Sequence, residues 1–137
     1  MASARPKRAV LVVEDAIAVR TLLAEFFRRH GYEVLHARDP DVAIKRLHAS
    51  RPVIDAMILD VHLEGNRSGL EVLELIRLDT RFADLTVVVL TGHSPLDDRD
   101  VEIIQRNRAY LLYKQNGYRH VFDSLRQIVK PLAKPAA

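Results

Sequence analysis

The sequence predicts a doubly wound α/β fold in which five parallel strands alternate with five helices. The chain has 137 residues, which suits one domain, and its 48% hydrophobic and 28% charged residues exclude intrinsic disorder. Its short apolar runs are rich in β-branched residues and do not alternate with polar ones. Such runs are typical of strands buried on both faces of a parallel sheet, and segments with helical periodicity separate them.

The apolar runs define the five predicted strands. They lie at residues 9–13, 32–37, 56–59, 87–90 and 109–113, and the second and fifth are the weakest. None approaches the roughly 20 residues that a helix needs to cross a bilayer. The sequence therefore predicts neither a membrane span nor a membrane partner.

The first two helices are indicated by spacing and by their ends. Apolar residues recur three and four positions apart at Val19, Leu22, Leu23, Phe26 and Phe27, and Gly31 is expected to end this helix. Asp39 supplies a cap and Pro40 a first-turn residue for a second helix. The apolar face of that helix contains Ala43, Ile44 and Leu47.

The remaining three helices follow the same logic. Ser68 and Glu71 form a Ser-x-x-Glu capping box before Leu73 and Ile76. The next helix is expected to start around Ser94, Pro95 and Asp97. One face of the last helix is marked by Val121, Phe122, Leu125, Ile128 and Val129.

Right-handed crossovers connect strands that alternate with helices in this way. Five such units in a chain of this length favour the flavodoxin-like strand order 2-1-3-4-5, in which the first and third strands are neighbours. Ligands bind outside the carboxyl ends of the strands, at the point where the winding reverses.

Polar residues follow four of the predicted strands at that end: Glu14 and Asp15, Asp60, Thr91 before Gly92, and Lys114. Clustered carboxylates resist joint ionisation unless a cation is present, and a site of few carboxylates suits Mg²⁺. An ionised Asp can act as a nucleophile toward phosphorus, and a metal, a lysine and a hydroxyl can neutralise the transferred oxygens. The combination predicts phosphoryl chemistry at this rim of the sheet.

These residues occur in a set of motifs: Leu-Val-Val-Glu-Asp at 11–15, Ile-Leu-Asp-Val at 58–61, Ser-Gly-Leu-Glu at 68–71, Leu-Thr-Gly at 90–92, and Lys114. Together they resemble the receiver domain of two-component response regulators, over residues 9–129. The resemblance implies Asp60 as the phosphoacceptor, Thr91 as the switch hydroxyl and Lys114 as the phosphate contact. It implies Mg²⁺ as the cofactor, bound by Glu14, Asp15, Asp60 and the backbone carbonyl of His62.

The resemblance also implies a biological role. We expect a stand-alone, cytoplasmic receiver at residues 9–130, between a flexible basic segment at 1–8 and a flexible tail at 131–137. A histidine kinase or phosphotransfer protein would supply the phosphate in a two-component system or phosphorelay. Output would pass to a partner protein, or to a homodimer, through residues 96–129. The expected catalysis is limited to self-phosphorylation and slow self-dephosphorylation at Asp60.

The sequence departs from the family pattern at several positions. Gln115 stands where proline usually follows the lysine, and we expect a trans bond there because a cis bond before a non-proline residue costs about 2.5–4 kcal/mol. Leu111 stands where an aromatic residue is common, with Tyr113 on the same face of the strand and Tyr110 on the other. Glu64 replaces a common proline in a loop that is one residue longer than usual. These departures motivate an alternative, a receiver-fold module that binds proteins without phosphorylation.

Other functional classes have less support. The chain has no cysteine, which excludes disulfides and thiol nucleophiles and fits a reducing compartment. The net charge of +3 comes from dispersed basic residues, so a solvated surface is favoured over a nucleic-acid partner. An aspartate-based phosphatase would need a second Asp and a Thr where His62 and Glu64 stand. His62 and His93 leave open a transition-metal site, although oxygen ligands dominate the rim.

Overall fold

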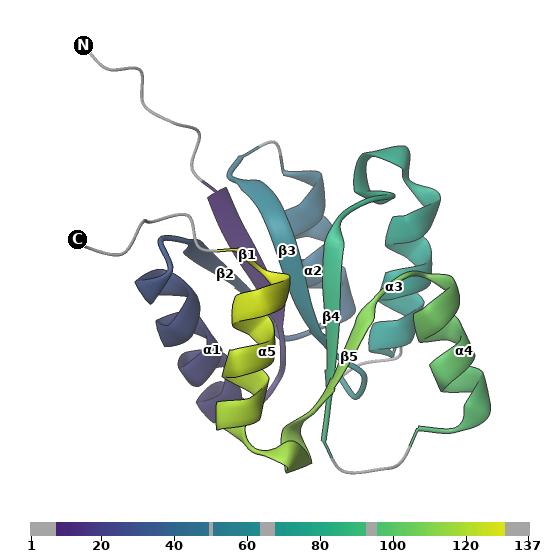
Figure 1. The fold of residues 1–137 in the computed structure, drawn as a ribbon. Helices are drawn as coiled ribbons and strands as arrows, with labels where there is room; N and C mark the ends of the chain where they lie inside the picture. The colour runs from purple at the N-terminus through teal and green to yellow at the C-terminus, as the bar shows by residue number, and fades with distance from the viewer. Residues whose placement is uncertain (1–7, 50, 64–67, 93–95, 131–137) are drawn as a thin grey trace.

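The computed structural model of the chain describes residues 8–49, 51–63, 68–92 and 96–130. Within them, five parallel strands form one sheet in the order β2-β1-β3-β4-β5, which confirms the predicted order (Figure 1). The elements are β1 (Arg8–Val13), α1 (Ile17–Arg29), β2 (Glu33–Ala37), α2 (Pro40–His48), β3 (Val53–Asp60), α3 (Gly69–Leu78), the 3-10 turn η1 (Thr80–Phe82), β4 (Thr86–Thr91), α4 (Asp98–Arg106), β5 (Tyr110–Tyr113), the 3-10 turn η2 (Lys114–Asn116) and α5 (Tyr118–Ile128).

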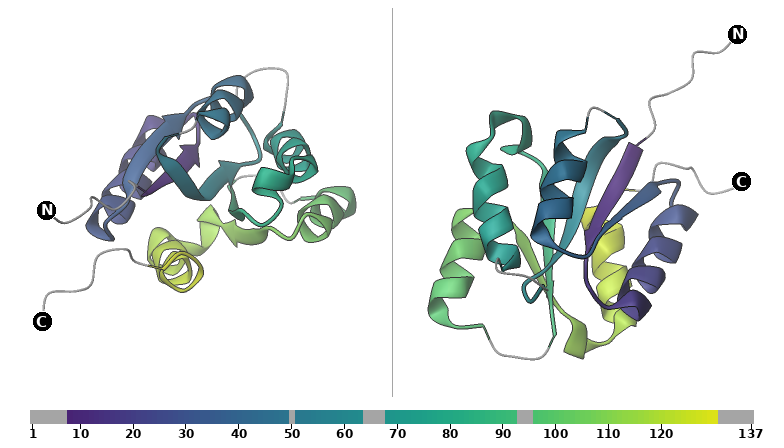
Figure 2. Two further views of the ribbon diagram at one scale, coloured as in Figure 1. Left: turned by 90° about the horizontal axis from the view of Figure 1, so that it is seen from above. Right: turned by 180° about the vertical axis from the view of Figure 1, so that it is seen from behind.

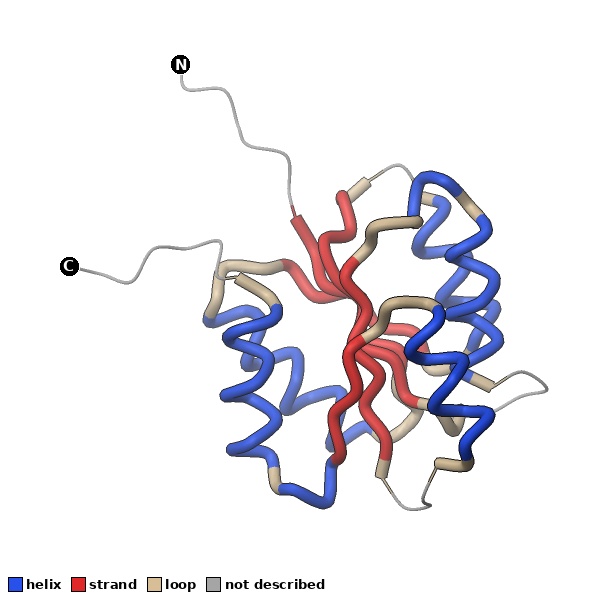
Figure 3. The backbone as a smooth tube through the Cα atoms, turned by 45° about the vertical axis from the view of Figure 1, so that its right-hand side comes forward, coloured by secondary structure: helices blue, strands red, loops and turns tan. Residues whose placement is uncertain are grey.

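Helices cover both faces of the sheet, so the fold has three layers. Helices α1 and α5 lie on one face, and α2, α3 and α4 lie on the other (Figures 2 and 3). Successive residues of β1 point to opposite layers: Val10 and Val12 pack with α1 and α5, whereas Leu11 and Val13 pack with α2 and α3. This double burial explains why the central strands are continuous apolar runs.

The third strand is longer than its apolar run predicts. β3 starts at Val53 rather than Ala56, and its first residues pair with the start of β1. The register shifts between Ala9 and Val10, which skips Asp55 in the pairing, and the carboxylate of Asp55 accepts a hydrogen bond from the guanidinium of Arg8. Because the charged Asp55 interrupts the apolar run near the start of β3, the hydrophobic pattern did not indicate this part of the strand.

The predicted caps of the first two helices are present. Gly31 has φ +91° just after α1, a backbone conformation that favours glycine. The side chain of Asp39 accepts a hydrogen bond of 2.9 Å from the Val42 N–H at the start of α2. Both helices therefore begin or end where the local sequence predicts.

The caps of α3 and α4 differ in completeness. The Ser68 hydroxyl accepts a hydrogen bond of 3.4 Å from the Glu71 N–H, which is one half of the predicted capping box. A complete capping box is formed at α4: the Asp97 carboxylate accepts a hydrogen bond from the Asp100 N–H, and the Asp100 carboxylate accepts one from the Asp97 N–H. Ser94 and Pro95, also predicted at this helix start, lie outside the described residues.

The last helix is tied to the beginning of β2. Tyr32, predicted as the first residue of that strand, immediately precedes it, and its ring is buried. The Tyr32 hydroxyl donates a hydrogen bond of 2.6 Å to the carbonyl of Lys130, just after α5. Residues 1–7 and 131–137 lie outside the described residues, so the expected flexible ends stay predictions. None of the described helices is long and apolar enough to cross a membrane.

The start of α3 packs directly on the end of β3. The Gly69 N–H donates a hydrogen bond of 2.9 Å to the Val61 carbonyl, and a Cβ atom at Gly69 would lie 1.9 Å from the Asp60 carbonyl oxygen. Because that contact is with backbone, a Gly69→Ala variant must displace α3 or the end of β3. We expect it to lower the free energy of unfolding by roughly 2–3 kcal/mol, measured by urea denaturation.

Gly92→Ala is the matched control, because among the described residues a Cβ there would contact only the flexible side chain of Lys114, at 3.3 Å from its Cδ. Equal stability losses in the two variants would contradict the proposed backbone contact.

Candidate functional site

The carboxyl ends of β1 and β3 meet at a small cleft on the rim of the sheet. The cleft has a volume of about 250 Å³ and is lined by Glu14, Asp15, Ala16, Asp60, His62, Gly92 and Lys114. Since β1 and β3 are hydrogen-bonded neighbours, the sheet order brings Glu14, just after β1, close to Asp60 at the end of β3. Five of the predicted site residues thus line one cleft.

Three carboxylates in this cleft form a potential cation site. Glu14, Asp15 and Asp60 each offer an oxygen atom, and these atoms all lie within 4.8 Å of one another. The side chains of Glu14 and Asp60 are almost fully buried, with 2% and 6% of their surface exposed. A donor set made only of oxygens suits a hard divalent cation such as Mg²⁺.

Lys114 provides the positive charge that faces these acids. Its Nζ donates hydrogen bonds of 3.1 and 3.2 Å to the two carboxylate oxygens of Glu14 and lies 3.5 Å from Oδ2 of Asp60. Burial alone would lower the pKa of Lys114, but the charges of Asp60 and Glu14 outweigh it and raise that pKa. Lys114 is therefore held as an ammonium between the two buried carboxylates.

One lysine does not offset the crowding of negative charge. Burial, and then repulsion from Asp60, raise the pKa of Glu14 to about 7, although Lys114 acts in the opposite direction. Ionised Glu14 is consequently unfavourable in the folded protein without a cation, and a divalent ion would relieve this cost.

The backbone around Glu14 is fixed from three sides. Its N–H donates to the Ala37 carbonyl at 2.9 Å, and its carboxylate accepts from the Ala16 N–H at 3.3 Å. Nη1 of Arg20 donates to the Glu14 carbonyl at 3.2 Å. The sequence analysis did not single out Arg20, because nothing in the spacing of a dispersed arginine indicates a bond to a backbone carbonyl.

Thr91 and Gly92 complete the rim at the end of β4. Thr91 is buried, and its hydroxyl has no hydrogen-bond partner within the described part of the chain. Thr91 does not line the cleft itself, whereas the adjoining Gly92 does. The structure therefore places Thr91 at the carboxyl end of β4, next to the cleft-lining Gly92, and its role as a switch hydroxyl stays a prediction.

The loop after Asp60 is described only in part. The His62 N–H donates a hydrogen bond of 3.3 Å to Oδ1 of Asp60, and the His62 side chain is exposed. The metal-binding role predicted for its backbone carbonyl stays a prediction. Glu64 and His93 lie outside the described residues.

The departures from the family pattern have clear structural outcomes. Within the described residues the one cis peptide bond precedes Pro52, so the Lys114–Gln115 bond is trans, as expected. Leu111 packs against the core beneath α3 and α4, Tyr113 is half-buried, and Tyr110 is 52% exposed. Tyr110 and Leu111 therefore differ in surroundings, as their alternation along β5 predicts.

Comparison with known proteins identifies the family. The profile of the response regulator receiver domain matches residues 10–126, and the chain belongs to this family. The phosphate regulon transcriptional regulatory protein PhoB of Klebsiella pneumoniae is 33% identical over 92 residues, which are 67% of this chain and 39% of PhoB. The nitrogen assimilation regulatory protein NtrX of Azorhizobium caulinodans is 33% identical over 89 residues, 64% of this chain and 19% of NtrX.

Solved structures agree with this assignment. The receiver domain of NtrX from Brucella abortus superposes with a TM-score of 0.71 at 27% identity, covering 88% of this chain and 98% of that one. The Mn²⁺-bound form of the response regulator Rcp1 superposes with a TM-score of 0.73 at 24% identity, covering 96% of this chain and all of the other. The chain spans well under half the length of the full regulators it matches.

The raised pKa of Glu14 makes stability depend on pH. The pKa of Glu14 is about 7 in the folded protein, against an ordinary value of 4.5. Because the carboxyl group is therefore harder to ionise in the folded state, the free energy of unfolding falls as the pH rises from 4.5 to about 7. Glu14→Gln removes this loss. In metal-free protein we expect the free energy of unfolding of the variant to exceed that of the wild type by about 3 kcal/mol at pH 8, and to differ little near pH 4.5. Urea denaturation in EDTA measures both values.

Glu25→Gln controls for removal of a negative charge, because the Glu25 side chain is exposed on α1. If the gain in Glu14→Gln were the same at both pH values, repulsion in the cleft would not be its cause.

Proposed function

We propose that the chain is a phospho-accepting signalling switch of a two-component system or phosphorelay, phosphorylated on Asp60 in the presence of Mg²⁺. One observation carries the proposal. The buried carboxylate of Asp60 lies next to the carboxylates of Glu14 and Asp15 and to the ammonium group of Lys114, in an open cleft at the carboxyl end of β3. Membership of the receiver-domain family supports this choice of residue.

The residues at the rim fit a bound Mg²⁺. The carboxylates of Glu14, Asp15 and Asp60 would hold the ion together with the backbone carbonyl of His62. Burial, and then repulsion from Asp60, raise the pKa of Glu14, and a cation would offset both effects. When bound, the ion neutralises charge on the phosphoryl oxygens. The structurally similar regulator Rcp1 has a Mn²⁺-bound form, which supports a divalent metal for this chain as well.

The nucleophile of the transfer step is the ionised side chain of Asp60. One carboxylate oxygen attacks phosphorus, the bond between phosphorus and the donor's leaving oxygen or nitrogen breaks, and the leaving group keeps the electron pair. Lys114 lies 3.5 Å from Asp60 and can shift from Glu14 toward the phosphoryl oxygens. Water later attacks the acyl phosphate and restores the carboxylate, so catalysis stays limited to the chain's own modification.

Thr91 provides the link from phosphate to the surface. Its hydroxyl is buried and has no hydrogen-bond partner among the described residues, so it has an unused donor close to Gly92 and the cleft. In our proposal this hydroxyl turns to donate to a phosphoryl oxygen, and the end of β4 follows it. A buried polar group that gains its missing partner favours the phosphorylated conformation.

We place the output surface at residues 96–129, which include α4, β5 and α5. Of the described residues of α4 only Ile104 is buried, whereas α3 buries five residues, so α4 is held to the sheet by little apolar contact. Weakly anchored elements change conformation at the lowest free-energy cost. A downstream protein or a second copy of the chain would read this change, and a cytoplasmic histidine kinase or phosphotransfer protein would load the site.

The first test is phosphorylation itself. The protein is incubated with acetyl phosphate, with and without Mg²⁺, and its intact mass is measured. We expect one added phosphate that requires Mg²⁺ and that is lost in Asp60→Asn, because the amide is not a nucleophile toward phosphorus.

Asp55→Asn is the matched control, since Asp55 lies on the same strand at its opposite end, paired with Arg8. Loss of the adduct in both variants, or its persistence in Asp60→Asn, would contradict Asp60 as the acceptor. No adduct in folded wild-type protein, with partner binding intact in Asp60→Asn, would instead establish a phosphorylation-independent module.

The proposed output surface is tested by amide hydrogen exchange. Beryllium fluoride with Mg²⁺ serves as a non-hydrolysable phosphoryl mimic. We expect severalfold changes in exchange rates within α4 and β5, because α4 is weakly anchored, and little change in α3. Changes confined to the rim residues, with α4 unaffected, would argue against residues 96–129 as the output surface.

A further inference from the structure

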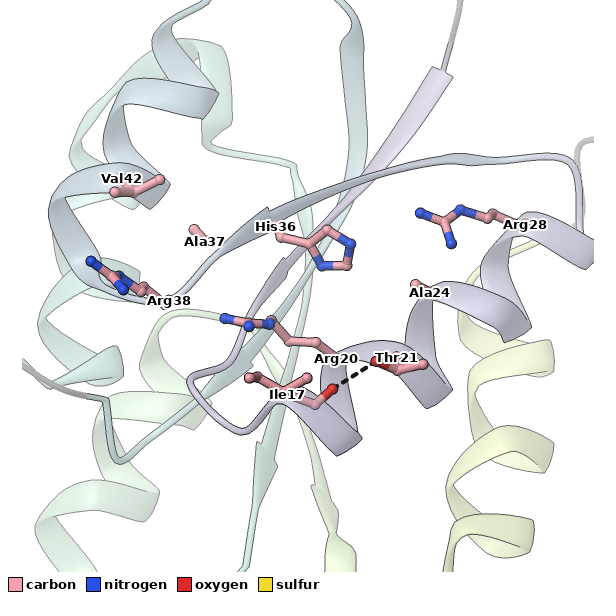
Figure 4. A pocket seen from close by; sticks show the side chains of 9 residues that line it. All are labelled: Ile17, Arg20, Thr21, Ala24, Arg28, His36, Ala37, Arg38 and Val42. Atoms are coloured by element: carbon pink, nitrogen blue, oxygen red, sulfur yellow. Dashed lines mark hydrogen bonds between the residues drawn. The ribbon is translucent and has the colours of Figure 1, made fainter.

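A second cavity lies beside β2, the edge strand of the sheet, and adjoins the acidic cleft through the hydrogen bond from Arg20 to the Glu14 carbonyl. It is open to solvent, has a volume of about 450 Å³, and is lined by residues of α1, the end of β2 and the start of α2 (Figure 4). The lining residues are Ile17, Arg20, Thr21, Ala24, Arg28, His36, Ala37, Arg38 and Val42. None of them lines the acidic cleft, so the two cavities are separate.

Positive charge dominates this cavity. Arg20 and Arg28 project from α1, and Arg38 follows β2, so the side chains of three arginines line the same cavity (Figure 4). Among the described residues, no Asp or Glu forms a salt bridge with any of the three. The neighbouring Arg29, in contrast, pairs with Glu25 at 2.9 Å on the same helix.

The acidic residue next to Arg38 makes no ion pair with it. Asp39 instead uses its carboxylate to cap α2 by accepting from the Val42 N–H. The mutual repulsion of the three cations is therefore left without a carboxylate counter-charge in the described structure.

His36 adds an unsatisfied polar atom on the cavity wall. Its ring projects between Arg20 and Arg28 (Figure 4), and its Nδ1 is buried without a hydrogen-bond partner in the described part of the chain. Burial, and then the charges of Arg20, Arg28 and Arg46, lower the pKa of His36. These neighbours include arginines on both α1 and α2, so the positive potential extends across the cavity.

We infer that this cavity binds a small molecule carrying two or more oxyanion charges, with its apolar part against Ile17, Ala24 and Val42. Guanidinium groups are the preferred protein partners of phosphate and carboxylate oxygens, and the volume is that of a small-ligand pocket. The mixed lining favours a compact ligand over nucleic acid, which would need basic residues along an extended track. The ligand would contact both α1 and β2 and supply the missing partner of His36.

The inference is tested by a residue-resolved NMR titration of the full chain in EDTA, with pyrophosphate as a phosphate probe and citrate as a carboxylate probe. We expect saturable shifts at residues 17–28 and 36–42. Arg28→Ala and Arg38→Ala should each weaken binding about tenfold, as loss of one charge-assisted contact does. Arg29→Ala should bind like the wild type, because its guanidinium pairs with Glu25.

Titration of the His36 ring gives a readout that a nonspecific charge effect would not move. Burial and the charges of Arg20, Arg28 and Arg46 lower the pKa of His36. A bound oxyanion offsets those charges, so the pKa of His36 should rise on saturation. Saturation by only one of the two probes would identify phosphate or carboxylate as the ligand group.

Several results would overturn the inference. One is the absence of saturable binding of either probe below about 10 mM. Another is an equal loss of binding in Arg28→Ala and Arg29→Ala, which would indicate general attraction to a basic surface. A third is binding of a polyglutamate peptide when neither small anion binds. Thermal unfolding of each variant establishes that it is folded.

Discussion

The contact between Lys114 and two buried carboxylates determines the rest of this site. Glu14 and Asp60 come together because β1 and β3 are adjacent, and Lys114 reaches them from the end of β5. The strand order, the double burial of the central strands and the close approach of Gly69 to Asp60 all serve to hold these groups. The fold thereby maintains a concentration of negative charge that one ammonium group balances only in part.

Much of this architecture could be predicted from the sequence, because the signals are local. Buried parallel strands are apolar runs, and the polar residues that end them fall on one rim once the strand order is known. Prediction failed where a strand carries a charge, as at Asp55, which belongs to β3 despite its polarity. For Thr91, the sequence predicts only that the residue lies at the end of a strand. No pattern in the sequence states whether its hydroxyl lines the cleft, and in the structure Thr91 is not among the lining residues.

The arginine cavity shows a different limit of sequence reasoning. Arg20 and Arg28 lie eight residues apart on α1, and Arg38 lies in the loop after β2, so in the sequence they look like ordinary dispersed surface charges. They converge only because α1 packs beside β2 and the chain turns into α2 at the sheet edge. Convergence of this kind depends on tertiary packing, which neither composition nor periodicity encodes. Arg20 in addition touches the Glu14 carbonyl and so adjoins both cavities.

The hydrogen bond between Tyr32 and Lys130 has a consequence for how the protein can be handled and connected. It fixes the end of α5 at the entrance of β2, on the same rim at which Arg8 begins β1. Asp60 lies at the opposite rim, about 20 Å away across the length of a strand. A fluorophore, tether or fused domain attached through Arg8 or Lys130 would therefore stand clear of the acidic cleft. Communication between such an attachment and Asp60 would have to pass through the body of the sheet and its helices.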